Sequence, residues 1–196
     1  MTTPNRSEHL ALFAALNTTF AGLHGLGDHW VQNSRDASGK GARGTHLVYA
    51  ADGKPVADDP WRHGKEGRTC TASAYGRFCV TRHVASYSAV QLLASVAVTR
   101  AFGMHVPVRA LLAGAAVNGL THAALDRREP LLWLAARAGK AGYIQHATAV
   151  RKPGDAAPEL SGPGKALMEL DEAAHRAIGV GTALVTTWLA TRRTVR

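Results

Sequence analysis

Four long apolar segments constrain the fold of this chain more than any other feature. Stretches free of Asp, Glu, Lys and Arg run over residues 10–27, 84–99, 110–125 and 177–191. Each stretch can form about four helical turns or more, and only 6% of the residues are aromatic, which favours helix over sheet. We therefore predict an all-α protein with helices over Ser7–Trp30, Ser73–Phe102, Pro107–Arg128 and Pro163–Thr191, and a shorter one over Pro130–Ala138.

Polar residues recur every four positions along these helices, which places them on one helical face. The first and third helices share a His-x-x-x-Asp motif, the fourth carries the reverse, Asp-x-x-x-His, and the second contributes a single histidine. These seven residues are His24, Asp28, His83, His122, Asp126, Asp171 and His175.

The link between the second and third helices is short, Gly103–Val106, and short links make antiparallel neighbours. In an up-down order, one end of the bundle contains the end of helix one, the start of helix two, the end of helix three and the start of helix four. The seven polar residues occupy those four positions. The sequence thus predicts an up-down four-helix bundle with its histidines and aspartates gathered at one end.

Burying a carboxylate or a charged histidine without a partner costs free energy, so we expect these seven side chains to surround a common binding partner. Histidine nitrogen and carboxylate oxygen suit zinc, iron or manganese. Seven ligands exceed one tetrahedral site, so we expect one or two divalent ions. Gln32, Tyr87 and Asn118 lie on the same faces and are expected to support the ligands. The alternative is a metal-free, hydrogen-bonded core network.

The uncharged stretches are short against the ~20 residues that a spanning helix needs, but the turns that bear the ligands extend them to that length. Residues 33–82 carry nine Lys and Arg and residues 127–165 carry seven, whereas the Gly103 link is sparse in them. The positive-inside rule then places both basic segments, and the ligand end, in the cytoplasm. We expect a membrane-embedded bundle. Mean hydropathy is only −0.09, which keeps a cytoplasmic protein as the alternative.

Residues 33–69 are rich in Gly, Asp, Arg and Lys and contain no apolar repeat. We interpret them as a long polar loop inserted between the first two helices, with a small hairpin around Asp52–Gly53. The chain is otherwise expected to form one domain over residues 1–196.

Four blocks occur in order along the chain: His24-Gly-Leu-Gly-Asp28-His-Trp-Val-Gln32, His83-Val-Ala-Ser-Tyr87, Thr121-His-Ala-Ala-Leu-Asp126-Arg-Arg and Leu170-Asp-Glu-Ala-Ala-His175. Together they resemble an uncharacterised actinobacterial family. That family is similar to small four-helix bacterial membrane proteins of unknown function, some of them labelled metal-dependent hydrolases. The resemblance covers all four helices and the Gly139–Lys140 region, but not residues 33–69. It implies a supporting role beside the ligands for position 172, where the family has Gln and this chain has Glu172.

The leading functional hypothesis is a hydrolase in which a metal activates water against an ester, amide or phosphoester. Asp28 or Asp126 would act as the general base. Arg127 and Arg128 follow directly and could hold an anionic group of a small substrate. The simpler interpretation is that two arginines favour a helix C-terminus or anchor it at the cytoplasmic surface.

Two other functions remain open. A net charge of +9 favours anionic partners, so the chain could be a non-enzymatic scaffold or mobile-element transfer protein that binds acidic lipid headgroups. It could also bind nucleic acid through residues 33–82. That segment contains nine basic and five acidic residues, and no recognised DNA-binding motif. The Walker phosphate-binding loop and the Gly-x-Ser-x-Gly motif of serine hydrolases are absent from the sequence.

Overall fold

The computed structural model describes residues 6–146 and 165–192, and these residues are mostly helical, as predicted. The long helices are α1 (Arg6–Gly25), α3 (Ala72–Ala101), α4 (Val108–Asp126) and α7 (Ala166–Thr191). The shorter ones are α2 (Ser34–Gly39), α5 (Glu129–Arg137) and α6 (Ala141–His146). Strands β1 (Leu47–Tyr49) and β2 (Thr69–Thr71) form a small antiparallel pair, with Val48 opposite Cys70.

The predicted helix bounds agree with the structure to within a few residues, with one change of geometry. The first predicted helix continues to Trp30, but α1 ends at Gly25 and a π-helix, η1 (Leu26–Val31), follows it. Helix α7 begins at Ala166, and the predicted start at Pro163 lies outside the described residues. A π-turn inserts an extra residue per turn and is frequent at functional sites.

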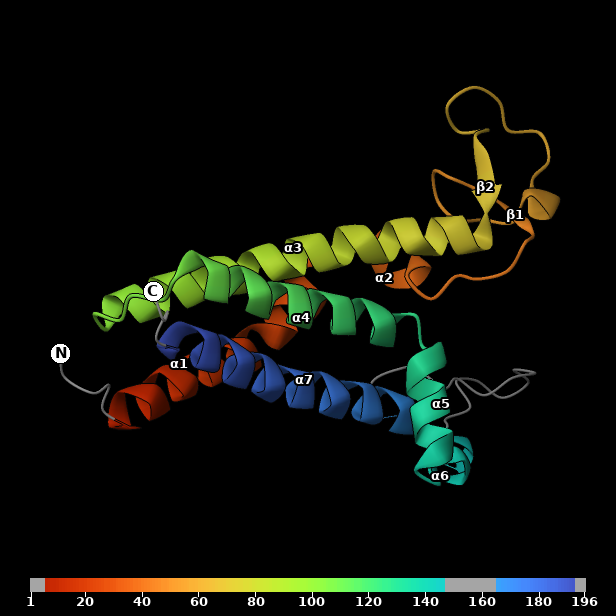
Figure 1. Ribbon diagram of the computed structural model, residues 1–196. Coiled ribbons are helices and arrows are strands. Elements are labelled where there is room, and N and C mark those ends of the chain that lie inside the picture. The colour runs from red at the N-terminus through yellow and green to blue at the C-terminus, as the bar shows by residue number, and fades with distance from the viewer. Residues whose placement is uncertain (1–5, 147–164, 193–196) are drawn as a thin grey trace.

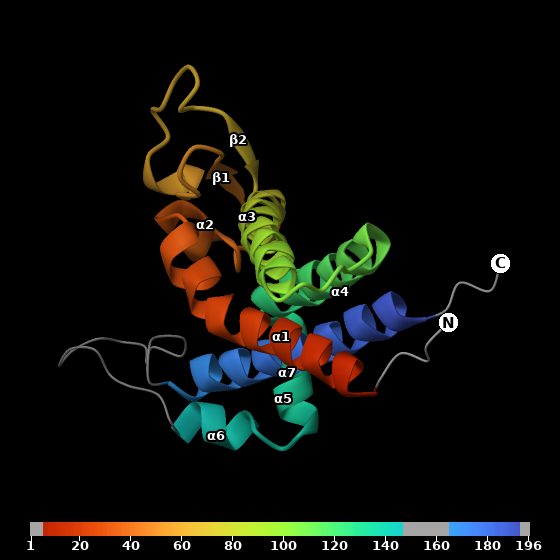
Figure 2. The same cartoon turned by 90° about the vertical axis from the view of Figure 1, so that its left-hand side faces the viewer.

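The long helices contact one another in a cycle. Helix α1 packs against α3 and α7, and α4 packs against the same two helices. Figure 1 shows that successive long helices run in alternate directions, so the end of α1, the start of α3, the end of α4 and the start of α7 lie together. The α3–α4 link lies at the opposite end. Figure 2 shows that α1 crosses α7 obliquely rather than running along it.

Helices α3 and α7 bury faces that are polar along much of their length, whereas α1 buries Leu12, Leu16 and Phe20 in an apolar cluster. The buried side chains of α3 beyond its midpoint recur every four residues and are all polar, and α7 buries several threonines. These residues are Tyr87, Gln91, Ser95, Thr99, Thr182, Thr186 and Thr187. Large apolar side chains instead face outward on the long helices, namely Leu93, Leu112, Leu120, Leu184 and Trp188. A water-soluble helix shows the reverse pattern.

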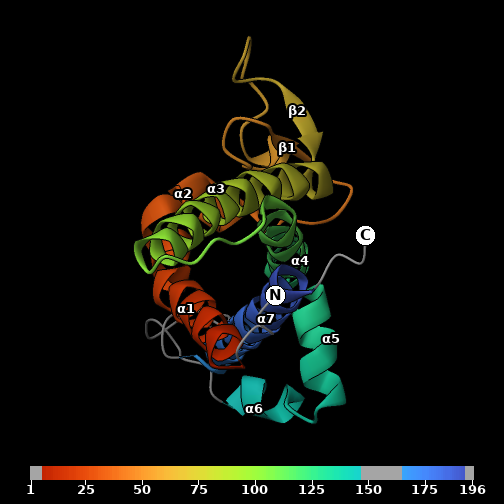
Figure 3. The same ribbon diagram turned by 60° about the vertical axis from the view of Figure 1, so that its left-hand side comes forward.

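Residues 33–69 are not the plain loop that their composition suggests. Asn33 caps α2, since its side-chain oxygen accepts a hydrogen bond of 2.8 Å from the backbone N–H of Asp36. Helix α2 packs on α3, and Val48 joins Tyr75 and Cys79 in a small core. A tight turn lies at Asp52–Gly53, where we predicted a small hairpin, and it is closed by a hydrogen bond from the N–H of Gly53 to the carbonyl of Tyr49. The segment as a whole is folded and packs against α3. Figure 3 shows the strands and the α5–α6 pair on opposite sides of the long helices.

Candidate metal centre

Glycine at position 27 allows η1 to approach α3 closely. A Cβ atom at Gly27 would lie 2.4 Å from Cδ2 of Tyr87, so no larger residue fits without displacing that ring. Gly27 is buried, and the next residue along η1 is Asp28. The close approach brings the Asp28 carboxylate beside His83 on α3 and His122 on α4.

Four side-chain atoms from η1, α3 and α4 gather at this point. The Nε2 atoms of His83 and His122 lie 2.9 Å apart. Oδ1 of Asp28 is 3.1 Å from Nε2 of His83 and 3.4 Å from Nε2 of His122. Oδ2 of Asp126 is 3.3 Å from each of the same two nitrogens. Two imidazole nitrogens and two carboxylate oxygens from three separate elements therefore face one another.

These separations match those between the ligands of one metal ion. Zinc binds histidine nitrogen and carboxylate oxygen at about 2.0–2.2 Å, so neighbouring ligand atoms of a tetrahedral zinc ion lie about 3.3 Å apart. Both histidines and Asp126 are almost completely buried. Three of these residues, His83, His122 and Asp126, bring their ligand atoms within 4.8 Å of one another and could hold a divalent ion.

The cluster also leaves polar atoms unsatisfied. Oδ1 of Asp28 and Oδ2 of Asp126 are buried and accept no hydrogen bond from the described part of the chain, although each lies near two histidine nitrogens. The Nδ1 atoms of His83 and His122 also lack partners there. Native proteins rarely bury unsatisfied polar groups, and a cation bound between the two carboxylates would satisfy both oxygens. The donor set could therefore hold a metal ion.

Lys40 is a site residue that the helical spacing did not predict. Its Nζ atom lies 2.8 Å from Oδ1 of Asp126, the oxygen that faces away from the histidines. It comes from the predicted insertion, where Gly39 packs so tightly on α3 that a Cβ atom would lie 2.6 Å from Sγ of Cys79. Only the tertiary packing of α2 reveals this position, because Lys40 shares no helical spacing with the histidines.

A chain of hydrogen bonds supports His24. Its Nδ1 atom lies 3.2 Å from the hydroxyl of Tyr87, which also accepts a hydrogen bond of 3.1 Å from Nε2 of Gln91. Nε2 of His24 is 3.5 Å from Oδ2 of Asp28. Tyr87 thus contacts His24 and Asn118 is buried, while the supporting roles expected of both stay a prediction. Gln91 was not predicted as a site residue.

The fourth helix brings His175 into the same cluster. Its Nδ1 atom donates a hydrogen bond of 2.9 Å to the backbone carbonyl of Asp171. Its ring stacks on His24 with centroids 5.1 Å apart, and its centroid is 4.2 Å from that of His122. Among the described residues, two groups bring their ligand atoms within 4.8 Å, namely His24 with Asp28 and His122, and His83 with His122 and Asp126. Neither group includes His175 or Asp171.

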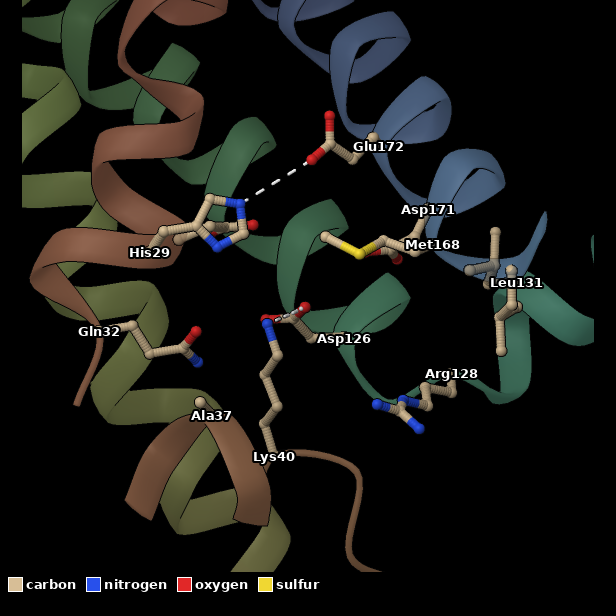
Figure 4. Close-up of a pocket in the computed structure, with 12 residues that line it drawn as sticks. His29, Gln32, Ala37, Lys40, Asp126, Arg128, Leu131, Met168, Asp171 and Glu172 are labelled. Atoms are coloured by element: carbon tan, nitrogen blue, oxygen red, sulfur yellow. Dashed lines mark ion pairs between the residues drawn. The ribbon is translucent and has the colours of Figure 1, made fainter. Parts of the chain in front are cut away.

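A pocket of about 190 Å³ opens beside the cluster and is shown in Figure 4. Asp28 and Asp126 form part of its wall, so the candidate ligands are accessible from it. The predicted ligand Asp171 lies on this wall, with its side chain 30% exposed. The predicted supporting residues Gln32 and Glu172 also line the pocket. Oε1 of Glu172 lies 3.9 Å from Nε2 of His29, a residue that we did not predict to be part of the site.

The two arginines after α4 differ in their environment. Arg127 donates a hydrogen bond of 2.9 Å to the backbone carbonyl of Lys40 and so ties α4 to the 33–69 segment. Arg128 lines the pocket, and its side chain has no ion pair or hydrogen bond within residues 6–146 and 165–192. Its φ of 63° is unusual for a non-glycine residue, and such strain is often found at functional sites.

Comparison of the chain with protein-family models, curated proteins and solved structures gave no match. The site is therefore interpreted from its own geometry and chemistry.

Proposed function

We propose that the chain is a membrane-embedded four-helix bundle whose cytoplasmic end binds a divalent metal ion and hydrolyses an ester, amide or phosphoester. The observation that carries this proposal is the meeting of Asp28, His83, His122 and Asp126, with two buried carboxylate oxygens that accept no hydrogen bond from the described residues. Zinc is the ion that this donor set suits first, and iron and manganese use the same ligands.

Two observations support the membrane. Within the described residues, Arg6–Val31 and Val108–Asp126 are long and apolar enough to cross a bilayer, a test that core helices of soluble proteins can also pass. The inverted polarity of α3 and α7 adds a separate argument, because polar side chains face the interior and apolar ones face outward. The basic segments that flank the ligand end favour a cytoplasmic location for it.

The chain's own residues suggest a division of roles. A bound divalent ion would supply a water molecule with its pKa lowered toward neutrality. Asp28 and Asp126 would hold the ion, and Lys40 would orient Asp126 by binding its outer oxygen. This leaves Asp171, partly exposed on the pocket wall, as the base that takes a proton. Arg128 would bind an anionic part of the substrate.

A metal-free scaffold is the competing function, and its weakness lies in hydrogen bonding. Without a metal, the carboxylates of Asp28 and Asp126 would depend on protonated His83 and His122, whose Nε2 atoms lie 3.1–3.4 Å away. The Nδ1 atoms of both histidines would still have no hydrogen-bond partner among the described residues, at about 1–3 kcal/mol for each such atom. A bound metal ion would hold both carboxylates without those protons.

The test is a hydrolysis assay on protein purified in detergent. Wild type is stripped with a chelator and then supplied with zinc or manganese, and chromogenic carboxylic esters, amides and phosphoesters are offered. We expect metal to restore hydrolysis of one of these classes, with at least a hundredfold loss in Asp28→Asn. Asp58→Asn, which removes an exposed carboxylate far from the pocket, serves as the matched control. Metal-bound wild type that is inactive on all three classes would argue for a structural metal.

A further inference from the structure

A second hollow lies between α3, α4 and the 33–69 segment, at the same end of the bundle as the candidate metal centre. It is an open groove of about 710 Å³, and none of the residues that line it also lines the pocket beside the metal centre. Its basic side chains come from three parts of the chain, with Arg43 from the 33–69 segment, Arg77 from α3, and Arg127 directly after α4. Glu129 is the one acidic residue of the lining. The groove therefore carries a net positive charge and suits an anionic ligand.

The three arginines differ in how much of their hydrogen-bonding capacity is used within the described part of the chain. Arg43 pairs with Glu129 at 2.8 Å, which neutralises that carboxylate. Arg127 donates one N–H to the backbone carbonyl of Lys40. Arg77 is exposed and has no ion pair or hydrogen bond there. A guanidinium carries five N–H donors, so Arg77 and Arg127 retain donors for a phosphate group.

An exposed apolar strip continues from the groove along α4. Val117, Leu120 and Ala124 are spaced three and four residues apart and lead to Arg127, so they follow one face of the helix. Leu120 is 73% exposed and Val117 is 37% exposed. Ala124 also lines the groove, which joins the strip to the arginines. Basic side chains at the end of an exposed apolar strip match an anionic headgroup attached to an acyl chain, whereas a free phosphate ion would contact the arginines alone.

We propose that this groove binds one anionic phospholipid, with the phosphate on Arg77 and Arg127 and an acyl chain along Val117 and Leu120. The inference goes beyond the proposed hydrolysis and rests on only one part of the proposed function, the placement in the membrane. That placement puts this end of the bundle at the cytoplasmic surface, where anionic lipids attract basic side chains. The metal centre and the lipid site are then separate, because they share no lining residue.

Native mass spectrometry on protein released from detergent micelles tests the groove. Delipidated wild type is offered equal amounts of phosphatidylglycerol and phosphatidylcholine with identical acyl chains. We expect one retained phosphatidylglycerol per chain and little phosphatidylcholine. In Arg77→Gln the affinity for phosphatidylglycerol should fall about 10-fold or more, as expected for the loss of a charged hydrogen bond. Arg100→Gln, which removes an exposed arginine from the opposite end of the same helix, is the matched control and should bind the lipid as wild type does.

The outcomes separate this inference from the proposed function. Equal retention of the two lipids would overturn the lipid site, and so would an equal loss of affinity in the two variants. Displacement of the lipid by an equal concentration of inorganic phosphate or of a short oligonucleotide would show a site for free anions or nucleic acid instead. A chain that purifies without detergent would contradict the membrane placement as well, whereas a membrane-extracted chain that retains no phosphatidylglycerol would contradict the lipid site alone. The lipid selectivity of wild type decides the matter even if a variant fails to fold.

Discussion

His83 on α3 and His122 on α4 bring their Nε2 atoms to 2.9 Å from each other, with a carboxylate oxygen of Asp28 on one side and of Asp126 on the other. Two imidazole nitrogens at this distance are held together either by one shared proton or by a common cation. In the first arrangement the carboxylate oxygens have only ion pairs of 3.1–3.4 Å with the two imidazoles among the described residues. In the second, a cation could use the ligand atoms of His83, His122 and Asp126, which lie within 4.8 Å of one another, and we propose a metal ion at this position.

Lys40 should raise the affinity for the metal without being a ligand itself. Lys40→Met removes the cation that holds the outer oxygen of Asp126. We expect zinc affinity to fall about 10- to 100-fold, as is typical when a residue that orients a ligand is lost. Competition with a chromogenic chelator measures the change. Lys65→Met, at an exposed position, should leave affinity unchanged, and an equal loss in both variants would contradict the role given to Lys40.

Gly27 should be intolerant of even a methyl group. The added Cβ of Gly27→Ala would overlap the ring of Tyr87, which is buried and hydrogen-bonded to His24. We expect a loss of about 1–3 kcal/mol in the free energy of unfolding, together with weaker metal binding. Gly22→Ala on α1 meets no atom within 4 Å and should be neutral or slightly stabilising. Denaturation in detergent compares the two, and equal stability would show that η1 does not need this close contact.

Arg128 should affect the substrate and not the metal. Arg128→Gln removes from the pocket wall a guanidinium that has no ion pair among residues 6–146 and 165–192. A charged hydrogen bond is worth about 1.5–3 kcal/mol, so KM for an anionic substrate should rise about 10- to 100-fold while the metal content stays the same. Arg137→Gln on the exposed face of α5 is the control. A loss of bound metal in Arg128→Gln would place this arginine in the metal site instead.

The proposed orientation in the membrane can be tested by labelling. In a variant with Cys70 and Cys79 replaced by serine, single cysteines are introduced by Lys65→Cys and His105→Cys, both at exposed positions. In intact cells, an impermeant maleimide should label the second variant and spare the first until the cells are opened. Labelling of position 65 from outside would reverse the topology, and protection of both positions would favour a cytoplasmic protein.

Much of the site was predictable because it depends on helical periodicity and connectivity. A spacing of four residues identified His24 with Asp28 and His122 with Asp126, and the alternating helix direction predicted that their helix ends meet. The same logic included His83 and His175, which lie in the cluster. Asp171 follows the same spacing but lies on the pocket wall, outside the two groups of close ligand atoms. Periodicity fixes a helical face, but it does not fix how far a side chain lies from its neighbours.

Other features depend on contacts that no local pattern encodes. Lys40 reaches Asp126 only because α2 folds back on α3, and the polar composition of residues 33–69 indicated a loop there. The π-helix at Leu26–Val31 depends on the fit between Gly27 and Tyr87, which are far apart in sequence. The difference between Arg127 and Arg128 likewise arises from tertiary structure, since the sequence presents them as equivalent neighbours.

Metal content measured by elemental mass spectrometry, on detergent-extracted wild type beside His122→Ala, is the most decisive test of the proposed metal centre. His122 belongs to both groups of close ligand atoms, so its loss should affect every ion in the cluster. We predict one to two equivalents of zinc, iron or manganese in wild type and almost none in the variant. Folded wild type without metal, even after incubation with all three ions, would contradict the metal centre and leave a polar core network in its place.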